Sequence, residues 1–220
     1  MKLSTIALII GAASALDPNP VPVMGHLPGW KLGTVGAPID VRLFYDVFCP
    51  DSLATHSALK TLLTQPSPVA GKSYNDILDM RASPFVLPYH VHSFQATQVI
   101  PYLDDICAAD STKCYQDEYA DMCWAEWETV LADTATSEDD WTLAWGKKTA
   151  AKFNIPESEF TNLWNRNKDT HNTNYRVREY WKYGASIGAA GTPVSFINGV
   201  MLDNTPATVD GWKTIFEAFY

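Results

Sequence analysis

Strand-like segments stand towards both ends of this chain, and a long stretch of helical pattern separates them. Residues 39–45 form a continuous run of mainly β-branched and aromatic side chains, which predicts a strand covered on both faces. Apolar residues then recur at helical spacing across residues 94–183. Near the end of the chain, Asn198-Gly199 stands between two short apolar runs, a pattern typical of a two-residue β-hairpin. The chain is therefore predicted to be an α/β protein with a helical insertion.

The segments between these landmarks complete the predicted order. Pro50 stands where a helix can begin, and apolar residues follow it at helical spacing until Pro66. A second strand is predicted at 85–92, although Pro88 inside it indicates an edge strand, a bulge or an early end. A closing helix is predicted at 209–219. With 220 residues, 46% of them hydrophobic, the chain can form one medium domain or a small domain carrying an insertion.

The net charge of the chain argues against nucleic acid as a binding partner. The chain carries 16 Lys and Arg against 25 Asp and Glu, a formal net charge of −9. It has no basic run of the kind that neutralises a phosphate backbone. Nucleic acid is therefore not an expected partner.

The first 15 residues resemble a secretory signal peptide. Lys2 precedes an uncharged apolar stretch at 3–13, which runs into a small-residue Ala-Ser-Ala end. That stretch is too short to span a bilayer, which needs about 20 residues, and its flanks suit cleavage after Ala15. Residues 16–38, rich in proline and glycine, are predicted to be an extended leader. We therefore expect a protein that is secreted or held in the endomembrane lumen, without membrane contact after cleavage and with its thiols in an oxidising compartment.

Two motifs resemble those of a known family. One is Phe-Tyr-Asp-Val-Phe-Cys-Pro at 44–50, and the other is Gly-Thr-Pro-Val-Ser-Phe-Ile-Asn-Gly at 191–199. Together they resemble the two signatures of the DsbA-like branch of the thioredoxin superfamily, and the similarity covers nearly all of residues 39–220. The resemblance implies a thioredoxin-like fold with an α-helical insertion domain. The thioredoxin-like domain would comprise 39–93 and 184–220, and the helical insertion 94–183.

The chain departs from that family at the second cysteine. A DsbA-like disulfide exchanger carries Cys-x-x-Cys, whereas this chain reads Cys49-Pro50-Asp51-Ser52, which resembles a monothiol variant found in eukaryotic thioredoxin-fold proteins. A cysteine at a helix start faces unsatisfied backbone N–H groups and the positive end of the helix dipole, which favour the thiolate. Ser52 could donate a hydrogen bond to that sulfur but could not attack a mixed disulfide. Release would therefore need glutathione, a substrate thiol or another cysteine of the chain.

The resemblance also implies the second half of the site. Pro193 matches the residue that is cis in the superfamily and packs opposite the cysteine. A cis bond would turn the backbone groups of Thr192 towards an extended substrate, which could pair as an added strand. A trans proline that opens an edge strand is the alternative. Cys49 and Ser52 are thus the predicted catalytic residues, and Pro50, Thr192 and Pro193 are the predicted substrate-binding residues.

The other three cysteines all lie in the predicted helical insertion. On one unbroken helix Cys107 and Cys114 would be about 10 Å apart, whereas a disulfide needs Cα atoms within about 7 Å. A turn at 109–111 would remove that obstacle, and in a secreted chain a structural Cys107–Cys114 bridge is the preferred pairing. Cys123, on an apolar helix face, is then a buried thiol.

No cofactor and no metal site are predicted, although glutathione is a candidate co-substrate. His90 and His92 could supply two metal ligands, but no cysteine or carboxylate pattern completes a site with them. His56 would lie about 10 Å along the first helix from Cys49, too far to act on it directly as a base.

These residues predict a thiol-disulfide oxidoreductase of the secretory pathway. It would act on protein or peptide thiols and disulfides through Cys49, by monothiol exchange. Two other functions stay open: a non-catalytic module that holds peptides beside Pro193, with Cys49 redox-inert, and an enzyme like the kappa-class glutathione transferases or isomerases. The cysteine and the signal peptide weigh against the second alternative.

Overall fold

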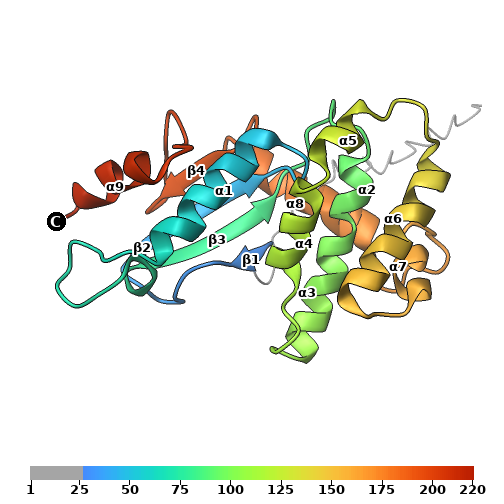
Figure 1. Cartoon of the computed structure of the whole chain (residues 1–220), viewed down its shortest axis with the longest axis horizontal. Helices are drawn as coiled ribbons and strands as arrows, with labels where there is room; N and C mark the ends of the chain where they lie inside the picture. The colour runs from blue at the N-terminus through green and yellow to red at the C-terminus, as the bar shows by residue number, and fades with distance from the viewer. Residues whose placement is uncertain (1–26) are drawn as a thin grey trace, which may run out of the picture.

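The computed structural model describes residues 27–220, in which a sheet and its covering helices are joined to a group of further helices (Figure 1). The strands are β1 (Trp30–Lys31), β2 (Ile39–Tyr45), β3 (Leu78–Pro84), β4 (Val194–Ile197) and β5 (Val200–Met201). The helices are α1 (Pro50–Leu63), α2 (Ser93–Thr97), α3 (Val99–Ala109), α4 (Gln116–Trp124), α5 (Trp127–Ala132), α6 (Glu138–Phe153), α7 (Glu157–Leu163), α8 (Thr173–Ser186) and α9 (Val209–Glu217), and a 3₁₀ turn, η1, spans Tyr74–Asp76. The predicted α/β fold with a helical insertion is confirmed.

The five strands of this part of the chain form one mixed sheet in the order β1-β3-β2-β4-β5. β2 runs parallel to β3 and antiparallel to β4. Leu43 and Tyr45 pack into the main core with α1, while Phe44 packs on the opposite face against Tyr183 of α8. Because both faces are covered, β2 is fully buried at these positions, as its mainly β-branched and aromatic sequence predicts.

The second strand lies earlier than predicted. β3 occupies 78–84 and pairs with β2 along its whole length, with the partly exposed Asp79 and Arg81 alternating with buried residues. The predicted segment 85–92 continues the pairing by one bond, from Phe85 N–H to the Tyr45 carbonyl at 2.7 Å, and then turns. Pro88 has no N–H to donate, and the N–H of residue 87 is taken by a side chain, so the ladder ends there.

The leader prediction overlooked a short edge strand. β1 pairs antiparallel with β3, and the Pro28 carbonyl accepts a hydrogen bond from Ser83 Oγ at 2.8 Å. Gly29 has a φ of +92°, and a Cβ there would lie 1.8 Å from the Ala82 carbonyl oxygen, so only glycine fits. Residues 1–15, the predicted signal peptide, and the leader up to residue 26 lie outside the described residues. Within residues 27–220, no helix is both long and apolar enough to cross a bilayer.

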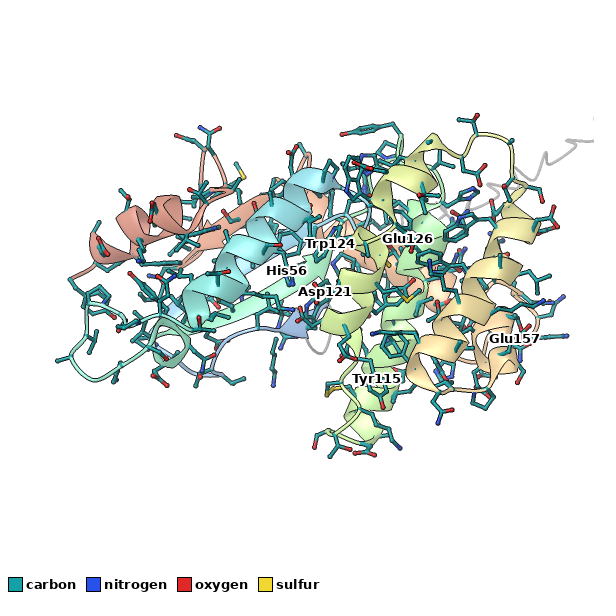
Figure 2. All side chains as sticks on the ribbon, in the orientation of Figure 1. His56, Tyr115, Asp121, Trp124, Glu126 and Glu157 are labelled. Atoms are coloured by element: carbon teal, nitrogen blue, oxygen red, sulfur yellow. A yellow bond between two sulfur atoms is a disulfide. The ribbon has the colours of Figure 1, made fainter. Side chains whose placement is uncertain are left out.

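The closing hairpin and the disulfide agree with the predictions. Asn198 and Gly199 have φ of 50° and 81°, the positive values that a type I′ turn requires. α3 ends at Ala109, and the turn that follows brings Cys107 and Cys114 together in a disulfide with a Cα–Cα distance of 4.4 Å (Figure 2). Cys123 is buried as a free thiol.

We expect loss of this disulfide to lower the free energy of unfolding. The bridge closes a loop with a sequence separation of 7. In the loop-entropy model this lowers the entropy of the unfolded chain and raises the free energy of unfolding by about 2.5 kcal/mol. The double substitution Cys107→Ser and Cys114→Ser, compared with the oxidised protein by urea denaturation, measures this loss. Non-reducing peptide mapping that finds Cys123 in the bridge would contradict the pairing.

Candidate active site

Cys49 stands at the junction between β2 and α1. It is the N-cap residue of α1, Pro50 occupies the first turn, and the Cys49 N–H donates to the Asp46 carbonyl at 3.1 Å. This is the start that the sequence predicts, because proline's fixed φ and missing N–H suit the first helical position. Cys49 is only 4% exposed, and it belongs to an apolar cluster with Phe44, Phe85, Leu87, Ala189 and Phe196.

The loop before β4 forms the other side of the site. The Thr192–Pro193 bond is cis, as predicted, and the Cys49 thiol donates to the Thr192 carbonyl with the sulfur and oxygen 3.5 Å apart. These two residues are separated by 143 positions in the sequence. The pairing of β2 with β4 brings them together, because residues 41–44 are opposite residues 194–197.

Two hydroxyl groups near the cysteine are buried and without hydrogen bonds in the described part of the chain. They are Ser52 Oγ in the first turn of α1 and Thr192 Oγ1 in the cis-proline loop. The sequence suggested that Ser52 could donate to the Cys49 sulfur, but this structure contains no such bond. Both hydroxyls therefore have unused hydrogen-bonding capacity within the described residues.

Asp46 is a residue of this site that the sequence analysis missed. Its buried carboxylate accepts hydrogen bonds from the backbone N–H of Phe48 (2.8 Å), the backbone N–H of Leu87 (2.7 Å) and Ser93 Oγ (2.7 Å). His90 Nδ1 lies 3.1 Å from the same carboxylate. One side chain thus joins the Cys49 loop to the loop after β3 and to α2. An acidic residue inside the otherwise apolar run 43–49 was the available signal.

The three histidines considered in the sequence analysis, and the free thiol of Cys123, do not come together in one site with Cys49. His90 faces Asp46, whereas His92 stacks on Trp141 with ring centroids 4.5 Å apart, and both lie in a turn instead of a strand. His56 is buried between Tyr45 and Trp124. Burial raises the pKa of the Cys123 thiol well above its usual value, which makes Cys123 a poor nucleophile.

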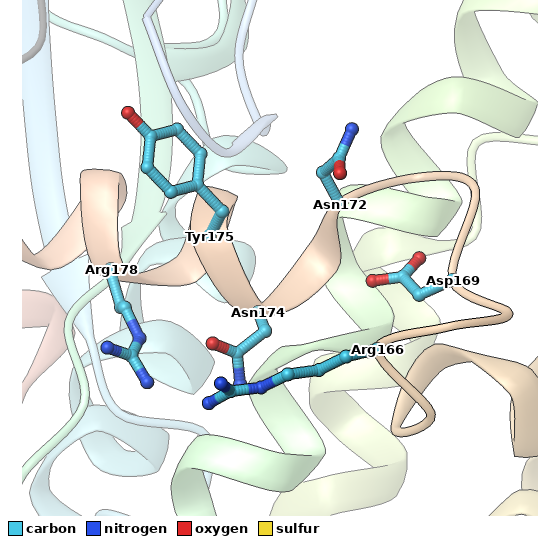
Figure 3. A pocket seen from close by; sticks show the side chains of 6 residues that line it. All are labelled: Arg166, Asp169, Asn172, Asn174, Tyr175 and Arg178. Carbon is cyan, nitrogen blue, oxygen red and sulfur yellow. The ribbon is translucent and has the colours of Figure 1, made fainter.

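Two cavities open along α8, and neither is lined by Cys49. One, of about 330 Å³, is lined by polar side chains from α8 and from the loop before it (Figure 3). The other, of about 540 Å³, is lined by Val86, Pro88, Phe94, Arg178, Trp181 and Lys182.

Comparison with known proteins identifies the fold. No family model matches the sequence, and no curated protein matches it. A protein-disulfide isomerase from Novosphingobium aromaticivorans has a TM-score of 0.64 at 14% identity, covering 88% of this chain and 98% of its own. DsbA from Chlamydia trachomatis resembles this chain with a TM-score of 0.57 at 16% identity, and the match covers 91% of this chain and 94% of that protein. The chain has a DsbA-like thioredoxin fold.

A third solved structure extends this likeness. The thiol-disulfide exchange protein α-DsbA2 from Wolbachia pipientis has a TM-score of 0.55 at 12% identity, over 87% of each chain. At these identities the likeness concerns the DsbA-like fold alone, so the chemistry of this chain has to be argued from its own residues.

Proposed function

We propose that this protein is a thiol-disulfide oxidoreductase that acts on protein or peptide thiols and disulfides through a single cysteine, Cys49. The observation that carries the proposal is the position of the Cys49 sulfur, at the N-terminus of α1 and 3.5 Å from the Thr192 carbonyl oxygen. The helix dipole favours negative charge at that end, and the cis-proline loop presents backbone groups beside it. Solved structures with this fold include proteins named for thiol-disulfide exchange and disulfide isomerisation.

The exchange proceeds in two balanced steps. The Cys49 thiolate attacks one sulfur of a substrate disulfide, so that a mixed disulfide forms with Cys49 and the other substrate sulfur leaves as a thiolate. A second thiol then attacks the mixed disulfide and frees Cys49. Ser52 occupies the position of a resolving cysteine and cannot perform this attack. Cys123 is buried, and Cys107 and Cys114 are bonded to each other, so we propose glutathione or a substrate thiol as the releasing group.

The location we propose is the secretory pathway. The first 15 residues have the pattern of a cleaved signal peptide, and a disulfide between Cys107 and Cys114 persists in an oxidising compartment.

A glutathionylated peptide tests the monothiol mechanism. We expect the wild-type protein to transfer the glutathionyl group from the peptide to Cys49, and turnover to depend on added reduced glutathione, which is converted to glutathione disulfide. Cys49→Ala should abolish the reaction, whereas Cys123→Ala is the matched control and should retain it. The measurement is release of the peptide thiol over time.

Two outcomes of this assay would contradict the proposal. Exchange that persists in Cys49→Ala would assign the chemistry elsewhere. Binding of the peptide without any exchange, equal in wild type and Cys49→Ala, would favour the non-catalytic peptide-binding module.

A further inference from the structure

A cluster of charged side chains joins α1 to α4, outside the Cys49 site. His56 lies on α1, and Asp117 and Asp121 lie one turn apart on α4 and so share a face of that helix. His56 Nε2 is 3.1 Å from Asp117 Oδ1 and 3.6 Å from Asp121 Oδ1. The three potential ligand atoms all lie within 4.8 Å of one another. Figure 2 shows His56 and Asp121 facing each other across the two helices.

The His56 ring is the observation that points to a ligand. Its side chain is 1% exposed and is held between the rings of Tyr45 and Trp124. Neither ring nitrogen has a well-formed hydrogen bond within residues 27–220, and the Nε2 contact to Asp117 Oδ1 at 3.1 Å is an ion-pair contact directed at the carboxylates. Buried polar groups normally have well-formed hydrogen bonds, so a buried imidazole nitrogen that converges with two carboxylate oxygens without one has the geometry of a coordination position.

Lys60 occupies the outer side of the same carboxylates. Its Nζ lies 2.8 Å from Oδ2 of Asp117 and 2.8 Å from Oδ2 of Asp121, so each carboxylate turns one oxygen to His56 and the other to Lys60. Lys60 is 41% exposed and carries a flexible stem, whereas His56 is fixed by packing. Trp30 Nε1 also donates to Asp117 Oδ1 at 3.1 Å, which fixes that carboxylate. The cluster thus brings two carboxylates together with a single ammonium group.

We propose that His56, Asp117 and Asp121 bind a divalent transition-metal ion, zinc being the probe of choice, and that Lys60 competes with the metal for the two carboxylates. A histidine nitrogen with two carboxylate oxygens is a ligand set that suits zinc, whereas calcium and magnesium prefer oxygen alone. Three protein ligands leave a fourth position for water. Asp121, which is 46% exposed, lies on the side from which an ion would enter. The bound ion would tie α1, which carries Cys49, to α4 of the helical insertion.

Titration calorimetry with zinc chloride tests the proposal on the full chain. Cys49→Ala serves as the background, because a thiolate would itself bind zinc. We expect one zinc ion per chain, and at least about tenfold weaker binding in Asp121→Asn and in His56→Gln, each of which removes a ligand. Glu118→Gln, an exposed position on α4 outside the cluster, is the matched control and should leave the affinity unchanged.

The competing lysine supplies the sharper readout. Lys60→Met keeps the aliphatic stem and removes the charge, so it should tighten zinc binding at least about tenfold. Zinc should also raise the unfolding temperature of the background protein, and raise it further in Lys60→Met, because the ion binds only the folded arrangement. Asp121 is on the surface, so its variant remains informative if His56→Gln fails to fold.

Three results would overturn the proposal. They are an affinity of the background protein weaker than millimolar, an affinity that Asp121→Asn leaves unchanged, and a Lys60→Met variant that binds zinc no more tightly than the background.

Discussion

Ser52→Cys is expected to give the protein the ability to oxidise a peptide dithiol in the absence of glutathione, which the wild type should lack. Residues three apart at a helix start lie about 5 Å apart, within the distance that a disulfide can bridge. Ser52 is buried in the first turn of α1, and its Oγ makes no hydrogen bond within the described residues, so the substitution breaks no existing bond there. The new thiol would stand where a resolving cysteine is needed.

The reaction can be followed as a single turnover. The oxidised variant, with Cys49 and the new cysteine bonded, should accept two electrons from the peptide dithiol and become a dithiol itself, while the peptide forms one disulfide per chain. Ser52→Ala is the matched control, since it removes the hydroxyl without adding a thiol and should stay inactive. Should the wild type perform this oxidation without glutathione, even with Cys123 replaced, the monothiol mechanism would be wrong.

Asp46→Ala is expected to lower the free energy of unfolding by about 3 to 5 kcal/mol, because it leaves three buried donors without an acceptor. Those donors lie in three different segments, so the loss should also loosen the loop that carries Cys49. The expected result is a lower urea midpoint, with little change in the slope of the unfolding free energy against urea concentration. Cys49 should also react more slowly with glutathione disulfide.

Asp51→Ala provides the comparison for this prediction. Asp51 is an exposed acid in the first turn of α1, where its interaction with the helix dipole contributes less than about 1 kcal/mol. Equal losses of stability in the two variants would show that Asp46 acts only as a negative charge near the helix and not as the acceptor that joins three segments.

Local patterns in the sequence determined much of the fold. The mainly β-branched and aromatic segment 39–45 predicted a strand with its bounds, Pro50 predicted the start of α1, and Asn198-Gly199 predicted the hairpin turn, because each depends on backbone preferences of adjacent residues. The preferred Cys107–Cys114 pairing, which required a turn near 109–111, is also confirmed. By contrast, the second strand was placed too late, since the charged side chains of residues 79 and 81 interrupt its apolar pattern and find their partners in the distant segment 27–36.

The arrangement of the candidate sites was decided by tertiary structure. Cys49 and Thr192 meet because β2 pairs with β4, an association between distant segments that the resemblance of two motifs implied but that no local pattern encodes. The carboxylate of Asp46 joins donors from residues 48, 87 and 93, and His56 meets Asp117 and Asp121 only where α1 packs on α4. Helical and strand periodicities report which side of an element is buried, but they do not specify the partner buried against it. That choice depends on the packing of the whole chain.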